Sequence, residues 1–377
     1  MSKFLLNEGY QKNKFVFNRG KGSKILNSPI KYDLSQCAGS LLLGHSHSIF
    51  KKSIKDVINK NISNFAAPNQ FAESYAKKIK KTISNCSKII FCNSGTEAII
   101  KSLRIVKAIN KKDKIVNVIG SWHGSVDKLL FKSNNKLKPE YLSSGISAED
   151  KKKLILIPYN DIELSKKILN KNKKNISCII IEPVQASLPT YDCKKYLNFL
   201  RTFCNKNNII LIFDELITGL RTNGSSVQNY FNIHADISTY GKCYGAGLPI
   251  GFISISKKID SKLKKKKLKV FFGGTFSGNS IVMHIGNKVF DFIQKNKKKI
   301  FSNINYKSKY FQDSLNKFYK KNNLDLKVYR FESILRLVFT KHNLNNRLQR
   351  DFFESKKFYR VENFRKFILK NKIYYPK

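Results

Sequence analysis

Long apolar runs, acidic residues, arginine and histidine are all scarce in this sequence of 377 residues. No apolar run approaches the roughly 20 residues that a membrane-spanning helix needs, and the N-terminus lacks the apolar stretch and cleavage site of a secretory signal. We therefore expect a soluble, cytoplasmic protein. Seven cysteines, an odd number without a CxxC pair, and only six histidines argue against a disulfide framework and predict no metal site.

The charge balance is strongly basic, because 72 lysines and arginines stand against 25 acidic residues, a net charge of +47. Such a charge attracts polyanions, which makes nucleic acid the first partner to consider. Only ten of the basic residues are arginine, the residue that reads bases and phosphates with paired hydrogen bonds. Because the lysines are spread along most of the chain, solvated lysine-rich surfaces explain the charge better than a nucleic-acid footprint.

Short apolar segments alternate with amphipathic ones through the middle of the chain. We expect strands at residues 87–92, 114–119, 176–181, 209–213, 237–240 and 252–255, and helices at 97–109, 162–169, 195–206 and 279–293. This alternation is typical of an α/β fold with a largely parallel sheet covered on both faces. In such sheets the ligand lies beyond the carboxyl ends of the strands.

The flanks of the sequence are more polar and predicted to be less regular. We expect a large domain at 45–295 and a smaller domain assembled from 1–44 and 296–377. Residues 132–153 have little periodicity and predict a long loop that could serve as a lid.

The segment Asn93–Thr96 (NSGT) lies between a predicted strand and a predicted helix. The free N–H groups of a helix start, with Ser and Thr hydroxyls beside them, can bind a phosphate. A serine or threonine before a helix is more often only an N-cap, so the fragment alone favours the N-cap.

Asp214 ends the predicted strand IILIF. A carboxylate at the end of a buried strand is costly unless a positive group meets it, and the protonated ring nitrogen of a pyridine cofactor is such a group. A helix cap or a salt bridge explains Asp214 equally well.

Lys242 differs from the other lysines in its surroundings. It follows an apolar strand, and three glycines and a proline come after it within Tyr240–Gly251, which lets the backbone approach a bound molecule closely. A partly desolvated lysine there is suited to forming a Schiff base. A phosphate site, a carboxylate and this lysine, each after a strand, are together what pyridoxal phosphate requires.

Ten short motifs extend this pattern in order from Arg19 to Asn279. They are RGKGS (19–23), LLGHSH (42–47), NFAAPNQ (64–70), NSGTEA (93–98), SWHGSVD (121–127), PYND (158–161), IEPVQAS (181–187), FDELITGLR (213–221), YGKCYGAGLPIG (240–251) and GGTFSGN (273–279). With them the sequence resembles the class III aminotransferases of pyridoxal-phosphate (PLP) fold type I, nearest the glutamate-1-semialdehyde aminomutase branch. The resemblance implies PLP as the cofactor.

The resemblance also implies roles for the residues singled out above. Lys242 would hold the cofactor as a Schiff base and shuttle a proton to and from the substrate. Asp214 would keep the ring nitrogen protonated. Ser94, Gly95 and Thr96 would bind the phosphate.

Three further positions complete the site that the resemblance implies. Trp122 would stack on the ring, where the family usually has Tyr or Phe. Ser187 would face the ring hydroxyl in place of the family's Asn. Thr275 would add a phosphate contact from the partner subunit, which implies a homodimer with shared active sites.

Two departures from the family pattern bear on the substrate. The upstream segment LLNEGYQKNKF (5–15) lacks the Arg with which the aminomutases bind the substrate carboxylate. The chain also ends at KIYYPK (372–377), where family members continue, so we expect a shortened C-terminal part of the small domain.

We therefore expect a PLP-dependent aminotransferase that moves an amino group between a small-molecule amino donor and an oxo acid or aldehyde through Lys242. The first alternative is the intramolecular 2,1-aminomutase, which needs no external donor and which the missing Arg disfavours. The second alternative is a non-catalytic PLP-fold or polyanion-binding protein that uses the positive charge.

Overall fold

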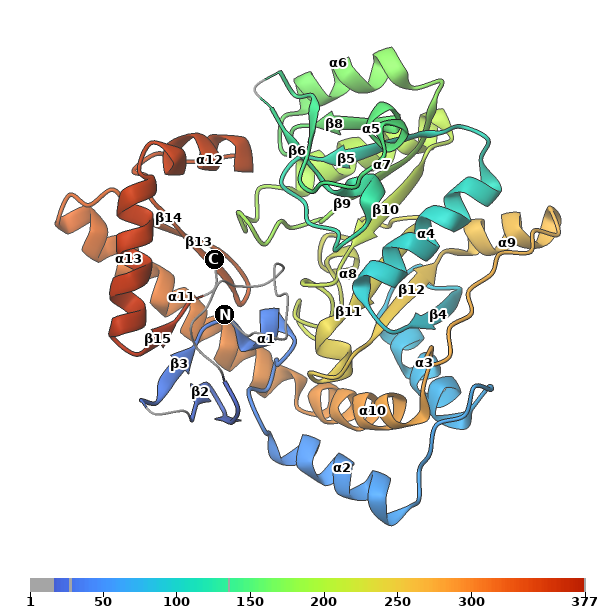
Figure 1. Ribbon diagram of the computed structural model, residues 1–377, viewed down its shortest axis with the longest axis horizontal. Coiled ribbons are helices and arrows are strands. Elements are labelled where there is room, and N and C mark those ends of the chain that lie inside the picture. The colour runs from blue at the N-terminus through green and yellow to red at the C-terminus, as the bar shows by residue number, and fades with distance from the viewer. Residues whose placement is uncertain (1–16, 27–28, 135, 376–377) are drawn as a thin grey trace.

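The computed structural model describes residues 17–26, 29–134 and 136–375 of the chain. Its centre is a seven-stranded sheet in the order β4, β12, β11, β10, β9, β5, β8 (Figure 1). The strands are β4 (Lys88–Cys92), β12 (Gly251–Ile255), β11 (Ile237–Gly241), β10 (Ile210–Asp214), β9 (Ile176–Ile181), β5 (Lys114–Val118) and β8 (Leu154–Ile157). All neighbours are parallel except β12, which is antiparallel to both β11 and β4. The predicted α/β class with a mostly parallel sheet is confirmed.

Helices cover both faces of this sheet because its central strands are apolar on both sides. In β9, Ile179 and Ile181 belong to one core cluster, whereas Cys178 and Ile180 belong to another, as the two-residue period of a strand requires. The first cluster includes residues of α6 (Ile162–Asn172), α7 (Lys194–Asn207) and α8 (Val227–Phe231). The second includes α4 (Gly95–Ile109) and α9 (Lys257–Lys265), and a third joins α3 (Gln70–Thr82) to α10 (Ser280–Lys295).

The two ends of the described chain meet beside the central sheet. Strand β15 (Ile373–Tyr374) pairs in parallel with β3 (Lys31–Asp33), in a small sheet with β1 (Gly20–Lys21) and β2 (Lys24–Ile25). Figure 1 shows these blue strands next to the orange and red C-terminal elements. The remaining elements of the two ends are α1 (Gln36–Gly39), α2 (Ser48–Asn59), α11 (Lys297–Lys321), β13 (Lys327–Phe331), β14 (Ile334–Val338), α12 (Arg347–Ser355) and α13 (Phe358–Lys370). The predicted domain boundaries at 45 and 295 stay a prediction.

Two local predictions are wrong. Residues 132–153 do not form one long loop, because they hold a hairpin of β6 (Phe131–Ser133) and β7 (Pro139–Tyr141) and the short helix α5 (Ala148–Lys153). Helix α5 is capped by Ser147 and has acidic residues in its first turn and lysines in its last, which suits the helix dipole. The C-terminal flank is also regular, because it forms the helices α11, α12 and α13. The lysines of α11 are mostly exposed, so forming this helix does not bury their charges.

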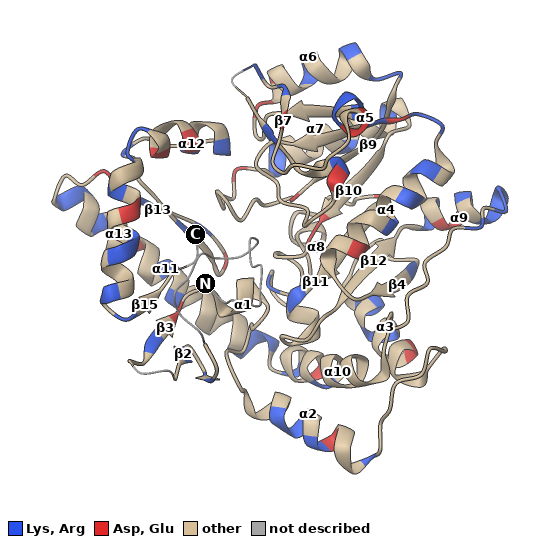
Figure 2. Ribbon diagram, in the orientation of Figure 1, with Lys and Arg blue, Asp and Glu red and all other residues tan. Residues whose placement is uncertain are grey.

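The basic residues are distributed over the whole molecule. In Figure 2, lysines and arginines lie on helices around the central sheet and on those of the C-terminal part, without gathering on one element. Within the described ranges, no helix combines the length and the apolar character needed to cross a membrane. The cytoplasmic location stays a prediction.

Candidate active site

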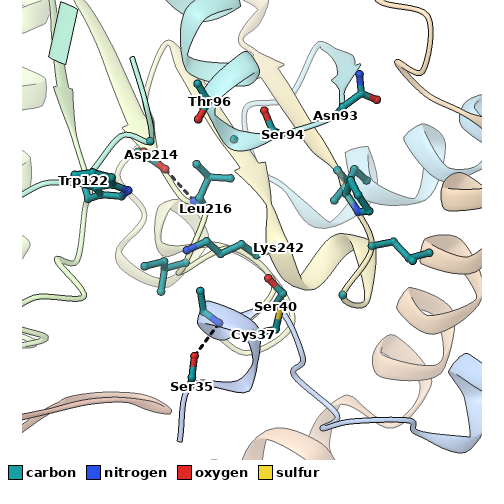
Figure 3. A pocket seen from close by; sticks show the side chains of 18 of the residues that line it. Ser35, Cys37, Ser40, Asn93, Ser94, Thr96, Trp122, Asp214, Leu216 and Lys242 are labelled. Atoms are coloured by element: carbon teal, nitrogen blue, oxygen red, sulfur yellow. Dashed lines mark hydrogen bonds between the residues drawn. The ribbon is translucent and has the colours of Figure 1, made fainter. Parts of the chain in front are cut away.

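Three strands bring the predicted site residues to the same edge of the central sheet. Strand β4 ends before Asn93–Thr96, β10 ends at Asp214, and β11 ends before Lys242. Because β4 and β11 are both antiparallel to β12, they run in the same direction as each other and as β10. Their carboxyl ends therefore meet, and a cavity of about 740 Å³ lies there (Figure 3).

Six of the eight predicted site residues line this cavity. They are Ser94, Gly95, Thr96, Trp122, Asp214 and Lys242. In Figure 3, Ser94 and Thr96 lie on one side of Lys242, and Ser35, Cys37 and Ser40 lie on the other. The cavity thus has the predicted residues at one wall and residues from the N-terminal part of the chain at the opposite wall.

The wall at Ser94 is the start of helix α4. The Ser94 hydroxyl accepts the N–H of Glu97 at 3.1 Å, so Ser94 is an N-cap, the alternative that the fragment favoured. The N–H groups of Gly95 and Thr96 have no partner within the helix, because the first turn never does. A Cβ on Gly95 would lie 2.4 Å from the side chain of Leu216, so any larger residue would require Leu216 to move. The helix start can therefore cap itself and still offer N–H groups to an anion.

Asp214 is buried and lies at the end of β10, with 2% of its surface exposed. Its Oδ2 lies 2.7 Å from Nδ1 of His123, and its Oδ1 accepts the N–H of Leu216 at 3.1 Å. The other ring nitrogen of His123 lies 3.2 Å from Oδ1 of Asn117 in β5. Asp214 therefore contacts a histidine, an arrangement close to the salt bridge that the sequence left as one alternative. It also lines the cavity.

Two residues of the site were missed in the sequence, His123 and Glu182. Glu182 directly follows β9 and lines the cavity, and its Oε1 accepts the N–H of Trp122 at 2.7 Å. Burial, assisted by the charge of Asp214, raises the pKa of Glu182 to about 7. The signal was present in the sequence, because a carboxylate directly after the predominantly apolar strand 176–181 repeats the pattern of Asp214.

Lys242 begins the short helical turn after β11 with a φ of 47°, a left-handed conformation that lysine seldom adopts. Burial lowers the pKa of Lys242, while the charges of Glu182 and Asp214 oppose that shift. A lower pKa increases the neutral fraction of the amine, which is the nucleophilic form. Within the described residues, Lys242 is the only lysine or arginine that lines the cavity.

The two other predicted site residues lie outside the cavity lining. The hydroxyl of Ser187 donates to the carbonyl of Gly120 at 3.2 Å. Thr275 is exposed, next to Phe276, which is 60% exposed. Their predicted roles, facing the ring and reaching the partner subunit, stay predictions.

Both ends of the described chain contribute residues to the cavity lining. Phe17 and Tyr374 line the cavity, and their rings meet edge to face at 4.9 Å between centroids. The segment 5–15, where the sequence lacks the family's carboxylate-binding Arg, lies outside the described residues. Across the described part of the chain, no cluster of three metal-ligand side chains occurs.

Comparison with known proteins gives matches over most of the chain. The model of the family "Aminotransferase class-III" matches residues 6–331. A glutamate-1-semialdehyde 2,1-aminomutase of Methanosphaera stadtmanae is 33% identical over 339 residues, which cover 89% of this chain and 79% of that protein. One from Clostridium novyi is 32% identical over 341 residues, which cover 89% and 78%.

Solved structures share the fold at lower identity. An omega-transaminase from Sphaerobacter thermophilus superposes with a TM-score of 0.80 at 20% identity, over 88% of this chain and 77% of that one. A glutamate-1-semialdehyde aminomutase from Pseudomonas aeruginosa PAO1 does so with a TM-score of 0.78 at 15% identity, over 88% and 75%. At these identities the likeness concerns the fold.

The raised pKa of Glu182 gives a pH-dependent contribution to stability. An unfolded glutamate ionises near its ordinary pKa of 4.5, whereas buried Glu182 ionises near 7, so the folded chain holds this proton between those values. The free energy of unfolding is therefore highest with respect to this group below pH 4.5, and it falls as the pH rises from there to about 7. Glu182→Gln stays neutral and should gain stability relative to wild type between pH 5 and 8, by on the order of 2 kcal/mol. Urea unfolding of both proteins at several pH values measures the difference, and parallel pH profiles would contradict it.

Proposed function

Because the chain belongs to the class-III aminotransferase family, whose members are PLP-dependent enzymes, we propose that it transfers an amino group between an amino donor and an oxo acid or aldehyde. The observation that carries the proposal is the meeting of Lys242, Asp214 and the start of α4 in one cavity. These three features come from separate strands, and each alone has a purely structural explanation. PLP explains all three together.

The described residues of the cavity fit PLP at three points. The N–H groups at the start of α4 suit a phosphate, the buried Asp214 suits a protonated ring nitrogen, and the Lys242 amine suits an aldehyde. Trp122 has an aromatic face in the same cavity. When bound, PLP supplies that aldehyde and a ring that accepts the electron pair of an adjacent carbanion.

Each residue then has a task that its surroundings support. Lys242 Nζ, made less basic by burial, would hold the cofactor and would accept a proton from the substrate carbon. Asp214 would bind the ring nitrogen of the cofactor, and its contact with His123 holds the carboxylate in place. Glu182 accepts the backbone N–H of Trp122 and so holds the backbone from which the indole projects.

We favour an aminotransferase over an aminomutase because segment 5–15 lacks the Arg with which the aminomutases bind the substrate carboxylate. An arginine bound to a carboxylate is worth roughly 2–3 kcal/mol, and the described lining offers only Lys242, which is engaged in the reaction. The 2,1-aminomutase remains the second candidate, because the relatives at 32–33% identity bear that name. A non-catalytic polyanion-binding protein is the third, and the scattered lysines give it little support.

Donor dependence separates these candidates. With PLP and an oxo acid or glutamate 1-semialdehyde as acceptor, we expect product only when an amino donor is added, because the amino group must come from a second molecule. Chromatography of the reaction mixture measures this. Isomerisation of glutamate 1-semialdehyde without a donor would identify the aminomutase instead, and a purified protein that never becomes yellow with PLP would favour the non-catalytic reading.

Replacing Lys242 with alanine should abolish covalent capture of PLP. In wild type, borohydride should bleach the visible absorption band and fix the cofactor on one lysine, which peptide mass spectrometry would identify as residue 242. Lys242→Ala should retain weak PLP binding without the fixed adduct, since no other described lysine lines the cavity. Lys264→Ala is the matched control, because that side chain is 69% exposed. An adduct of normal yield in Lys242→Ala would refute the assignment.

We also propose that the active unit is a homodimer in which Thr275 binds the phosphate held by the neighbouring subunit. Thr275 lies in an exposed turn, with Phe271 (76% exposed) and Phe276 (60% exposed) near it. Aromatic side chains so exposed are typical of interfaces. A two-fold arrangement would give each dimer two equivalent sites.

PLP should therefore shift a monomer–dimer equilibrium toward the dimer by mass action. Thr275→Ala should raise the PLP concentration for half-saturation by about tenfold, the worth of one hydrogen bond to a charged group, whereas Thr275→Ser should bind nearly as wild type does. Sedimentation with and without PLP, together with absorbance titration, measures both effects. A monomer that binds PLP as tightly as the dimer would exclude a shared site.

A further inference from the structure

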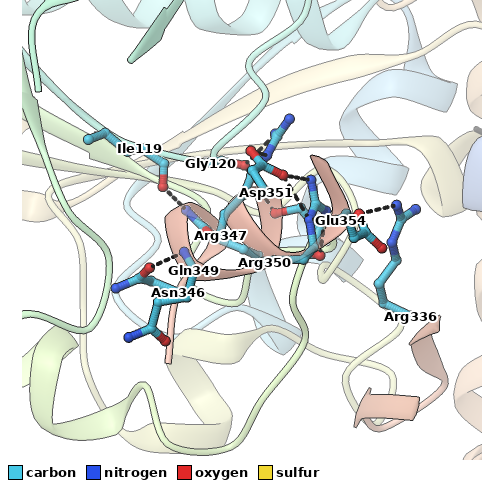
Figure 4. Close-up of polar contacts among 11 residues, drawn as sticks. Ile119, Gly120, Arg336, Asn346, Arg347, Gln349, Arg350, Asp351 and Glu354 are labelled. Carbon is cyan, nitrogen blue, oxygen red and sulfur yellow. Dashed lines mark hydrogen bonds and ion pairs between the residues drawn. The ribbon is translucent and has the colours of Figure 1, made fainter. Parts of the chain in front are cut away.

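Helix α12 of the C-terminal part lies against two loops of the candidate active site (Figure 4). The first loop, residues 119–124, follows β5 and contains Trp122; we call it the Trp122 loop. The second, residues 182–188, follows β9 and begins with Glu182; we call it the Glu182 loop. Both carry a cavity-lining residue, yet α12 itself does not line the cavity.

The two loops are joined by hydrogen bonds of their own. The N–H of Glu182 donates to the hydroxyl of Ser121 at 3.2 Å, and the N–H of Trp122 donates to Oε1 of Glu182 at 2.7 Å. Further along, the hydroxyl of Ser187 donates to the carbonyl of Gly120 at 3.2 Å. A displacement of either loop would therefore move both the indole of Trp122 and the carboxylate of Glu182.

Two arginines of α12 bind one backbone carbonyl in each loop. Arg350 Nη1 donates to the carbonyl of Ser187 at 2.8 Å, and Arg347 Nη1 donates to that of Gly120 at 3.4 Å. Gly120 has a φ of 96°, and a Cβ there would lie 2.8 Å from the Cβ of Arg347. The Arg347 side chain thus packs directly on the backbone two residues before Trp122.

Arg350 is held by carboxylates of its own helix. Only 6% of Arg350 is exposed, and burying a guanidinium is costly unless its hydrogen bonds are well met. Its Nε lies 3.0 Å from Oδ1 of Asp351 and 3.5 Å from Oε2 of Glu354. An apolar side chain could dock α12 without that cost, but it could not fix a carbonyl in direction as the planar guanidinium does.

We propose that Arg347 and Arg350 are positioning residues, which hold the Trp122 and Glu182 loops in the arrangement that receives the cofactor. The proposal rests on the proposed function insofar as the ligand of the cavity is PLP. Neither arginine touches the cavity, so their effect on cofactor binding passes through Gly120 and Ser187.

The fluorescence of Trp122 can report on this effect. Trp122 is the single tryptophan of the chain, and 55% of the residue is exposed, so its emission and its quenching by acrylamide report on the Trp122 loop without labelling. PLP placed against the indole should quench the same emission. The free chain and the PLP-bound chain can therefore be tested separately.

The experiment compares Arg347→Ala and Arg350→Met with wild type and with Arg360→Ala. Arg360 is the matched control, because its side chain is 71% exposed and its one described ion pair, with Asp325, is 3.9 Å long. We expect both test variants to make Trp122 more accessible to acrylamide and to raise the PLP concentration for half-maximal quenching by about tenfold, as for one lost charge-assisted hydrogen bond. Arg350→Lys, which can still donate to the Ser187 carbonyl, should recover part of the difference.

Far-UV circular dichroism and urea unfolding establish that each variant is folded. If Arg350→Met does not fold, Arg347→Ala still tests the proposal, because the Arg347 side chain is partly exposed and its removal disturbs the core less. Folded variants with the acrylamide and PLP quenching of wild type would overturn the proposal. Failure of wild type itself to bind PLP would refute the proposed function instead, while the acrylamide comparison of the free chains would still test the positioning role.

Discussion

The buried contact between Asp214 Oδ2 and His123 Nδ1, 2.7 Å long with each side chain only 1% exposed, is the interaction on which the candidate site depends. A lone carboxylate in that position would be unstable in its charged form. The contact joins the end of β10 to the loop after β5, and the same loop carries Trp122, whose N–H binds Glu182. One buried contact thereby links residues that follow three different strands.

The electrostatics inside the cavity are opposite in character to those of the whole chain. The protein carries a net charge of +47, yet the described cavity lining has two carboxylates, Asp214 and Glu182, and one amine, Lys242. Each buried charge therefore depends on its near neighbours. The lowered pKa of Lys242 and the raised pKa of Glu182 both arise first from burial. Both shifts favour the neutral form, and perturbed pKa values of this kind are typical of functional sites.

The residues that sequence reasoning found and missed differ in how local their signals are. Asp214 and Lys242 each follow an apolar strand directly, so a strand-end argument reaches them. Glu182 has the same local signal, but its partner Trp122 is 60 residues away, and nothing short-range in the sequence draws attention to the pair. The strand order was also beyond reach, because β12 enters antiparallel between β4 and β11. The hairpin and α5 within 132–153 were missed although Ser147 and the acidic residues after it form an ordinary helix start.

The scarcity of arginine makes its positions informative. With ten arginines among 72 basic residues, lysine supplies most of the surface charge, while buried Arg350 and partly buried Arg221 join segments far apart in the sequence. Arg350 binds the carbonyl of Ser187 across 163 positions, and Arg221 binds that of Gly39 across 182, while also reaching Ser333. A flexible ammonium cannot hold several acceptors in a fixed plane, whereas a guanidinium can. Even in a chain so biased toward lysine, arginine therefore occurs where two distant segments of the polypeptide must be held together, and Arg347 and Arg350 do this for the two loops that carry Trp122 and Glu182.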